Sequence, residues 1–379
     1  MLTPELTRLN PSETEQSYEA EYFLPAVQVD NVVEWVNPDV ELPFSLVPGS
    51  ATEAALMVLP HGSYTKADAM VLAVWGHRRS VLVAREPFSD AGGATYRDID
   101  SKGSGYVDWS PEKSEPGAPE KGLVGMGFEG GNWGNDRSNP LGLLDINAAR
   151  RDQAFGEIFS EGEVRVALPL AIIRLKEIVD KDGKKISIDE ARRRGILEED
   201  FDPAIELRGF GTRHRVNNWG NLGPAMSREG LNDAMSLVVN EIGIDPEEFT
   251  PKVYLLWFAR TFGEQMRKIH EMGFAHGGLH DGNLTLDCRL ADFDTAQSLA
   301  PNGEERDRAI DAEGPRSYLV VNQLRVSVAE YYPELKRSGE ELDAQGDPIM
   351  DELDNEIKRA YEEGYGELTD ELLYGDLPR

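Results

Sequence analysis

The stretch from residue 260 to residue 297 constrains the fold more than any other part of the chain. Its first part has the apolar spacing of a helix with one buried face, at Phe262, Met266, Ile269 and Met272. Gly273 ends that helix, and a polar loop follows. Residues 284–287 and 289–292 then predict two short strands joined by a turn. The stretch therefore predicts a helix, a polar loop and a β-hairpin in succession.

The loop and the hairpin carry the oxygen donors that Mg²⁺ prefers. Asn283 and Asp292 lie nine positions apart, a spacing that suits a magnesium ion bound to the phosphates of ATP. The run from His276 to Asn283 also resembles the catalytic loop of kinase-fold phosphotransferases. A kinase has its catalytic Asp two residues after the loop His, where this chain has Gly278. We therefore expect a pseudokinase or different chemistry with ATP; an ordinary polar hairpin is the structural alternative.

Charge and cysteine content indicate which partners the protein can bind and in which compartment it works. The 379 residues include 69 Asp and Glu against 39 Lys and Arg, a formal charge of −30. Such an acidic chain disfavours binding to nucleic acid and to anionic membranes. The single cysteine, Cys288, allows no intrachain disulfide, and the polar N-terminus lacks the apolar core of a signal peptide. We expect a cytoplasmic protein, and a monomer.

The order of the elements predicts an α+β protein with a two-lobed, protein-kinase-like fold. We expect an N-terminal arm over residues 1–50, laid on a small β-rich N-lobe over 51–222. Apolar runs near residues 55–59, 70–75 and 80–84 predict its strands. A Pro- and Gly-rich insertion at 108–139 interrupts this lobe. We expect a mostly helical C-lobe over 223–379, ending in acidic helices.

Basic residues near glycines in the N-lobe are candidates for binding phosphate. Lys102 ends a predicted strand and is followed by Gly103 and Gly105, which let backbone approach a ligand closely. A helix over 143–161 offers Asp152 or Glu157 as the acidic partner of Lys102. Later in the lobe, the guanidinium groups of Arg208 and Arg215 suit a triphosphate. The alternatives are a lysine beside a flexible turn and exposed arginines that balance an acidic surface.

These blocks together resemble the selenoprotein O family, pseudokinases that transfer AMP rather than phosphate. The match covers roughly residues 55–330. It rests on Lys102-Gly-Ser-Gly105, on Arg151-Asp152 with Glu157, on Arg208 with Arg215, on His276-Gly277 through Asn283 and Asp292, and on Tyr318 with Asn322-Gln323. The resemblance implies bound ATP and Mg²⁺, with phosphate held by Lys102, Arg208, Arg215 and Arg79 and metal held by Asn283 and Asp292. Its substrates would be Ser, Thr or Tyr hydroxyls of proteins.

The chain departs from that family at the position of the catalytic base. Gly282 stands where the family has an Asp directly before the loop Asn, so Asp281 or His280 would have to take that role. The run Asp292-Phe293-Asp294 is closer to small-molecule phosphotransferases. We therefore keep three hypotheses: a protein adenylyltransferase, a kinase or small-molecule phosphotransferase of the same fold, and a non-catalytic ATP-binding pseudokinase.

Overall fold

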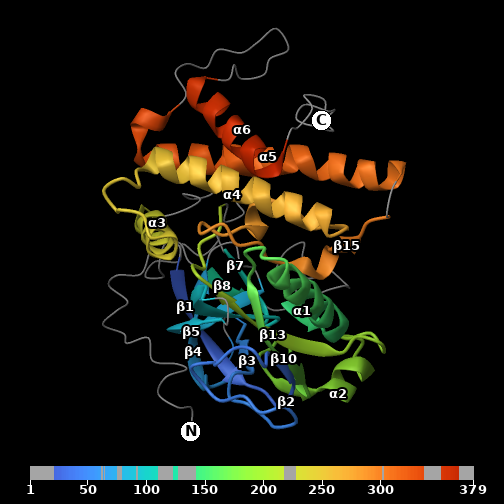
Figure 1. Ribbon diagram of the computed structural model, residues 1–379. Coiled ribbons are helices and arrows are strands. Elements are labelled where there is room, and N and C mark those ends of the chain that lie inside the picture. Colours follow the sequence, from blue (N-terminus) through green and yellow to red (C-terminus); the bar gives the residue numbers. More distant parts are fainter. Residues whose placement is uncertain are drawn as a thin grey trace. The chain divides into compact units, whose positions relative to one another are not determined.

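The chain divides into two compact units in the computed structural model (Figure 1). One consists of Met1–Ala154 and Ala167–Arg213, and we call it the β-rich unit. The other consists of Phe155–Val166 and His214–Arg379, and we call it the helical unit. The structure describes residues 21–60, 63, 65–74, 79–90, 93–109, 123–126, 142–216, 228–300, 303–336 and 351–366.

Within its described residues, the β-rich unit builds one nine-stranded sheet whose strand pairs are all antiparallel. Its strands are β1 (Glu21–Gln28), β2 (Asn31–Val36), β3 (Leu56–Val58), β4 (Ala69–Val74), β5 (Ser80–Ser89), β6 (Thr95–Lys102), β9 (Leu144–Asp145), β10 (Leu168–Leu175) and β13 (Pro203–Phe210). Their order is β2-β10-β13-β6-β5-β4-β1-β3, and β9 pairs with β13. Two smaller pairs are β7 (Tyr106–Trp109) with β8 (Leu123–Met126), and β11 (Glu177–Val179) with β12 (Lys185–Ser187), which leads into helix α2 (Ile188–Arg193).

The sheet curls so that its two ends approach each other. Strands β1 and β2 lie near opposite ends of the strand order, yet only Val29 and Asp30 connect them. A connection of this length spans roughly 10 Å. The loop before β3 also meets β2, because Val33 N donates to Ser50 O at 2.9 Å. The curled sheet encloses apolar side chains that are at most 1% exposed, among them Val33, Leu170, Ile173, Ile205 and Leu207.

The N-terminal arm that we predicted over residues 1–50 is in part wrong. Residues 1–20 lie outside the described residues, but Glu21–Gln28 and Asn31–Val36 are strands of the sheet. The interior of β1 includes Pro25. Pro25 contributes its carbonyl, which accepts from Leu59 N at 2.8 Å, and its missing N–H falls where the pairing of β1 with β3 ends.

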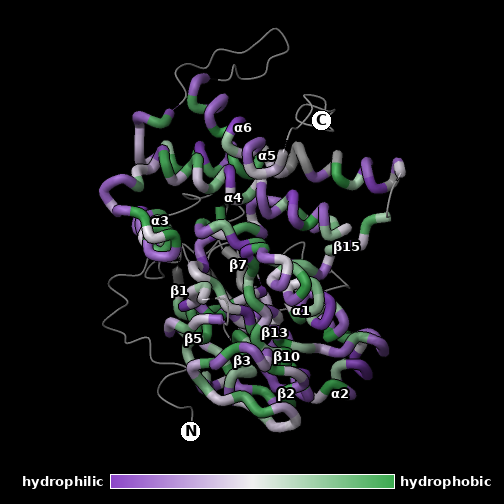
Figure 2. The backbone as a smooth tube through the Cα atoms, in the orientation of Figure 1, coloured by the Kyte–Doolittle hydropathy of each residue, from purple (hydrophilic) through white to green (hydrophobic). Residues whose placement is uncertain are grey.

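The helical unit is built around four helices in the part of the chain that the structure describes: α3 (Arg228–Ile242), α4 (Pro251–Glu271), α5 (Glu304–Tyr331) and α6 (Glu352–Tyr365). Helix α4 begins at Pro251, where the Thr250 side chain caps it by accepting from Val253 N. Green and purple segments alternate along α4 in Figure 2, as expected for a helix with one buried face. A Cβ at Gly364 of α6 would come within 2.0 Å of Arg260 O of α4, so glycine permits this close crossing.

Helix α1 (Ile146–Glu161) is shared between the units, with Phe155 and later residues assigned to the helical unit. The helical core gathers the aromatic rings of α1 and α4 with the loop that follows α4. Phe159 packs edge-on against Phe293 with ring centroids 5.2 Å apart, and Phe258 and Phe262 are fully buried.

The α+β prediction is confirmed, and the chain divides as a two-lobed kinase-like fold requires, into a β-rich and a mostly helical unit. The predicted hairpin over 284–292 is only partly formed, since Leu284 and Leu290 make an isolated bridge rather than two strands. Most of the predicted insertion at 108–139 lies outside the described residues; Leu123–Met126 forms β8. Among the described helices, none combines the length and the apolarity needed to cross a membrane.

Candidate functional site

In the β-rich unit, Lys102 and Asp152 form a buried ion pair. Lys102 is the last residue of β6, and Asp152 lies on α1. Lys102 is 1% exposed and Asp152 is 2% exposed, and Lys102 Nζ lies 2.8 Å from Asp152 Oδ2. Gly103 turns the chain away at φ +95°, where a Cβ would meet Ala204 O at 2.5 Å. Of the two acidic partners that the sequence offered for Lys102, the structure brings Asp152 to it.

Arg208 is held by a carboxylate that the sequence analysis did not single out. Its Nε and Nη2 donate to the two oxygens of Asp100 at 3.0 and 2.8 Å, a bidentate contact between residues that are 2% and 1% exposed. Arg208 Nη1 also lies 3.9 Å from Asp152 Oδ2. The register explains the cluster: Arg208 is opposite Asp100, and Glu206 is opposite Lys102, so all four side chains leave the same face. The alternation of charged residues at 98, 100 and 102 was the available signal.

In the helical unit, a loop follows α4 and carries the predicted catalytic residues. Glu313 of α5 holds this loop: its carboxylate accepts from Gly277 N at 2.7 Å, from His276 N at 3.3 Å and from His270 Nε2 at 3.0 Å. Burial raises the pKa of Glu313, but the hydrogen bond from His270 and the nearby His276 outweigh it, and the pKa lies below its usual value. Glu313 follows the loop by 36 residues, and no sequence pattern connects the two.

The loop is built without side chains at two successive positions. Gly277 has φ +76°, and a Cβ there would lie 2.2 Å from Thr295 O. A Cβ at Gly278 would lie 2.4 Å from Thr295 Oγ1. A side chain at position 278 would therefore require the Thr295 hydroxyl to move.

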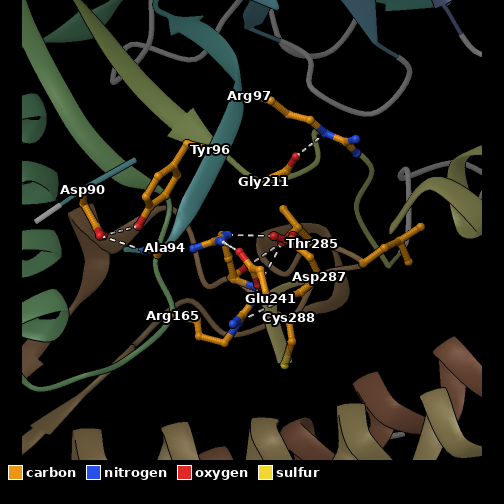
Figure 3. A network of polar contacts seen from close by, with 12 residues as sticks. Asp90, Ala94, Tyr96, Arg97, Arg165, Gly211, Glu241, Thr285, Asp287 and Cys288 are labelled. Atoms are coloured by element: carbon orange, nitrogen blue, oxygen red, sulfur yellow. Dashed lines mark hydrogen bonds and ion pairs between the residues drawn. The ribbon is translucent and has the colours of Figure 1, made fainter. Parts of the chain in front are cut away.

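Buried charged side chains hold the turn over residues 284–290 in place (Figure 3). Arg289 donates through Nε to Asp287 Oδ2 at 2.7 Å and through Nη2 to Glu241 Oε1 at 2.7 Å. Arg165 contacts the same Glu241 and also donates to Asp287 O at 3.1 Å. Thr285 Oγ1 donates to Asp287 Oδ1 at 2.5 Å. Cys288 at the corner has φ +61°, a strained conformation that these contacts maintain.

The two predicted magnesium ligands lie at the two ends of this turn. Ala291 N donates to Asn283 O at 2.9 Å, which joins the two ends of the turn. Asn283 Nδ2 donates to Gly278 O at 2.9 Å, so the amide oxygen is the atom that can face a cation. Asp292 has the left-handed φ of +65°, and its side chain is 23% exposed.

Arg215 contacts both the loop and Asp292. It donates to Gly282 O through Nη1, and the same nitrogen lies 3.6 Å from Asp292 Oδ2. Arg208 and Arg215, which the sequence grouped together, thus belong to different units, one on Asp100 and the other on Asp292. Both predicted arginine forks are already engaged within the protein.

His280 and Asp281 begin the short 3₁₀ turn Asp281–Asn283. Burial lowers the pKa of His280, while the charges of Asp292 and Asp281 act in the opposite direction. His280 Nδ1 accepts from Gly282 N at 3.0 Å, so the neutral ring carries its proton on Nε2. The Asp281 side chain is 21% exposed. The His280 side chain is 41% exposed, so both candidates for the base have access to solvent.

The remaining predicted residues have less direct placements. Arg79 contributes its backbone carbonyl to Gly103 N at 2.8 Å. Gly105 has φ +106°, which suits the turn after Lys102. Glu157 lies in the part of α1 that belongs to the helical unit.

The donor set fits ATP with Mg²⁺. Magnesium binds through one or two protein oxygens together with substrate phosphates and water, and Asn283 with Asp292 supplies this number. In the described part of the chain, no cluster of three or more His, Cys, Asp or Glu side chains forms an all-protein metal site. A magnesium ion here would therefore depend on the nucleotide for its other ligands.

Comparisons with known proteins add little. No family model matches the chain, and no curated protein matches it. Among solved structures, the crystal structure of a Toxoplasma gondii specific rhoptry antigen kinase domain is similar over 79% of this chain and 76% of that chain, at 10% sequence identity and a TM-score of 0.31. A likeness this low carries no argument about function, which has to be inferred from the site itself.

Proposed function

We propose that the protein is an Mg²⁺- and ATP-dependent transferase of the protein-kinase-like superfamily, and that it transfers AMP to hydroxyl groups of proteins. The buried pair of Lys102 and Asp152 at 2.8 Å carries this proposal. Placing both charges in a protein interior is costly, so the pair suits a site that needs an oriented ammonium group for phosphate. When bound, ATP would supply the AMP group, and Mg²⁺ would neutralise phosphate charge.

The side chains of this protein would act mainly by binding and orienting. Lys102 would hold phosphate charge, with Asp152 fixing its direction, and Asn283 and Asp292 would supply oxygens to Mg²⁺. A hydroxyl oxygen of the target would bond to the α-phosphorus, and the bond from that phosphorus to the bridging oxygen would break to release pyrophosphate. Asp281 would accept the hydroxyl proton, because Nδ1 of His280 is already occupied by Gly282 N–H. Such positioning supplies most of the rate enhancement expected for this chemistry.

Gly278 supports AMP transfer over phosphate transfer. The chain lacks at this position the carboxylate that orients the attacking hydroxyl in ordinary kinases. Phosphate transfer is the second candidate, because Asp292-Phe293-Asp294 is closer to small-molecule phosphotransferases. A cytoplasmic location, a monomeric state and hydroxyl-bearing protein substrates accompany the proposal as predictions.

Labelled ATP separates these candidates. The full chain is incubated with Mg²⁺, a cell extract and ATP labelled at either the α- or the γ-phosphate, and modified proteins are identified by mass spectrometry. We expect label on protein from the α-position only, and its loss in Lys102→Met. The control is Lys185→Met, on an exposed side chain of β12. Transfer of γ-label alone would establish the second candidate. No label from either position, together with no thermal stabilisation by ATP and Mg²⁺, would refute both.

A further inference from the structure

Glu206 is a buried carboxyl group that the proposed mechanism does not use. It lies on β13 directly opposite Lys102 and is 1% exposed. As a carboxylate, neither of its oxygens has a hydrogen-bond partner. A buried carboxylate without partners costs several kcal/mol, so such a group takes up a proton instead.

The surrounding charges leave Glu206 uncompensated. Among the described residues around it, the cations are Lys102 of β6 and Arg208 of β13. Each already contacts another carboxylate, on Asp152 of α1 and on Asp100 of β6. Three buried carboxyl groups thus share two cations, and a proton on one of them makes the cluster neutral. Strand β10 adds the apolar Ile172 opposite Glu206.

We propose that Glu206 is a neutral carboxylic acid in the folded protein and that it donates a hydrogen bond to Asp152, so that it is a positioning residue for the Lys102–Asp152 pair. Two ionised carboxylates can only accept hydrogen bonds, whereas a proton on Glu206 makes it the donor. Burial and the charge of Asp152 raise the pKa of Glu206 well above its ordinary value, against Lys102 and Arg208, and the hydrogen bond with Asp152 adds to the rise.

The functional part of this inference rests on the proposed binding of ATP by Lys102. When Glu206 loses its proton at alkaline pH, its charge repels Asp152 and competes for the ammonium group of Lys102. Binding of ATP with Mg²⁺ should therefore weaken as the pH rises through the pKa of Glu206, by at most about tenfold per pH unit. Glu206→Gln keeps the shape and a donor for Asp152 but has no charge to gain. It should bind ATP with little change over the same pH range.

Two measurements on the full chain test the inference. The first is isotope-edited infrared spectroscopy at neutral pH, with Glu206→Gln and the exposed Glu199→Gln as a matched pair. We expect a carboxylic-acid C=O band in the wild type and in Glu199→Gln, but not in Glu206→Gln. If the three spectra are alike, the neutral acid is refuted, whatever the protein does with ATP.

The second measurement is calorimetric titration with ATP and Mg²⁺ over a series of pH values, from pH 6 up to the highest alkaline pH at which thermal melts show the protein folded. We expect affinity to fall with pH in the wild type and in Glu199→Gln but not in Glu206→Gln. A parallel fall in all three proteins would overturn the positioning role. Absence of ATP binding at every pH would refute the proposed function, and with it this role, while the infrared result would still decide whether Glu206 is neutral.

Discussion

Replacing Arg289 by Met should destabilise the turn that carries Asn283 and Asp292. Arg289 is 1% exposed and makes two contacts of 2.7 Å, to Asp287 and to Glu241. Its loss would leave the fully buried carboxylate of Asp287 without its ion-pair partner. Removing one member of a buried pair costs about 3–5 kcal/mol, because the other charge remains buried. For a unit of this size, that cost corresponds to a fall in melting temperature of about 6–20 °C.

The assay is differential scanning calorimetry of the full chain, combined with hydrogen exchange of the peptide over residues 284–292. Arg308→Met, on a side chain that is 77% exposed, is the control and should melt close to the wild type. The double variant Arg289→Met with Asp287→Asn should lose less stability than the sum of the two single variants, because they share one contact. A shift below about 2 °C in Arg289→Met, or strict additivity, would show that this network does not hold the turn.

Three further changes test the loop and its surroundings. Glu313→Gln should lower the urea midpoint of unfolding at pH 7. The pKa of Glu313 is lowered in the folded protein, so its contribution to stability is lost on protonation, and the difference from the wild type should shrink below about pH 4.3. An equal difference at pH 3 and at pH 7 would contradict this. Gly277→Ala should lower the melting temperature more than Gly243→Ala. Both glycines have positive φ, but only at Gly277 would a Cβ meet a backbone atom, Thr295 O. Equal losses of stability would exclude this contact. Burial raises the pKa of the Cys288 thiol, so maleimide should label it in urea and not in the native protein; rapid native labelling would show that the turn opens.

The sequence predicted the parts of this fold that depend on local patterns. The spacing of Phe262, Met266 and Ile269 predicted α4 and its buried face, and Gly273 marked its end. The apolar runs before residue 90 predicted β3, β4 and β5. Strands β1 and β2 were missed, because prolines and acidic residues obscure their alternation and their partners lie far along the chain.

The residues of the candidate site also fall into those that the sequence predicted and those that it missed. The resemblance to kinase folds offered Asp152 and Glu157 as partners of Lys102, and the structure brings Asp152 to it. Asp100, Glu206 and Glu313 were missed, since their importance comes from tertiary contacts with residues distant in sequence. The positive φ of Asp292 could not be read from the sequence, because Asp adopts this conformation at only a small minority of its positions.

The curled sheet also dictates when the β-rich unit can fold during synthesis. Asn37, just after β2, donates to Pro169 O at the start of β10, 132 residues further on. A ribosome delivers β2 early, yet its neighbour becomes available only after most of this unit has been translated. Pairings this remote slow folding, since long stretches must be ordered before any contact rewards them. The nascent chain thus leaves the β10 side of β2 unpaired for much of its synthesis, which exposes this unit to aggregation until β10 has been made.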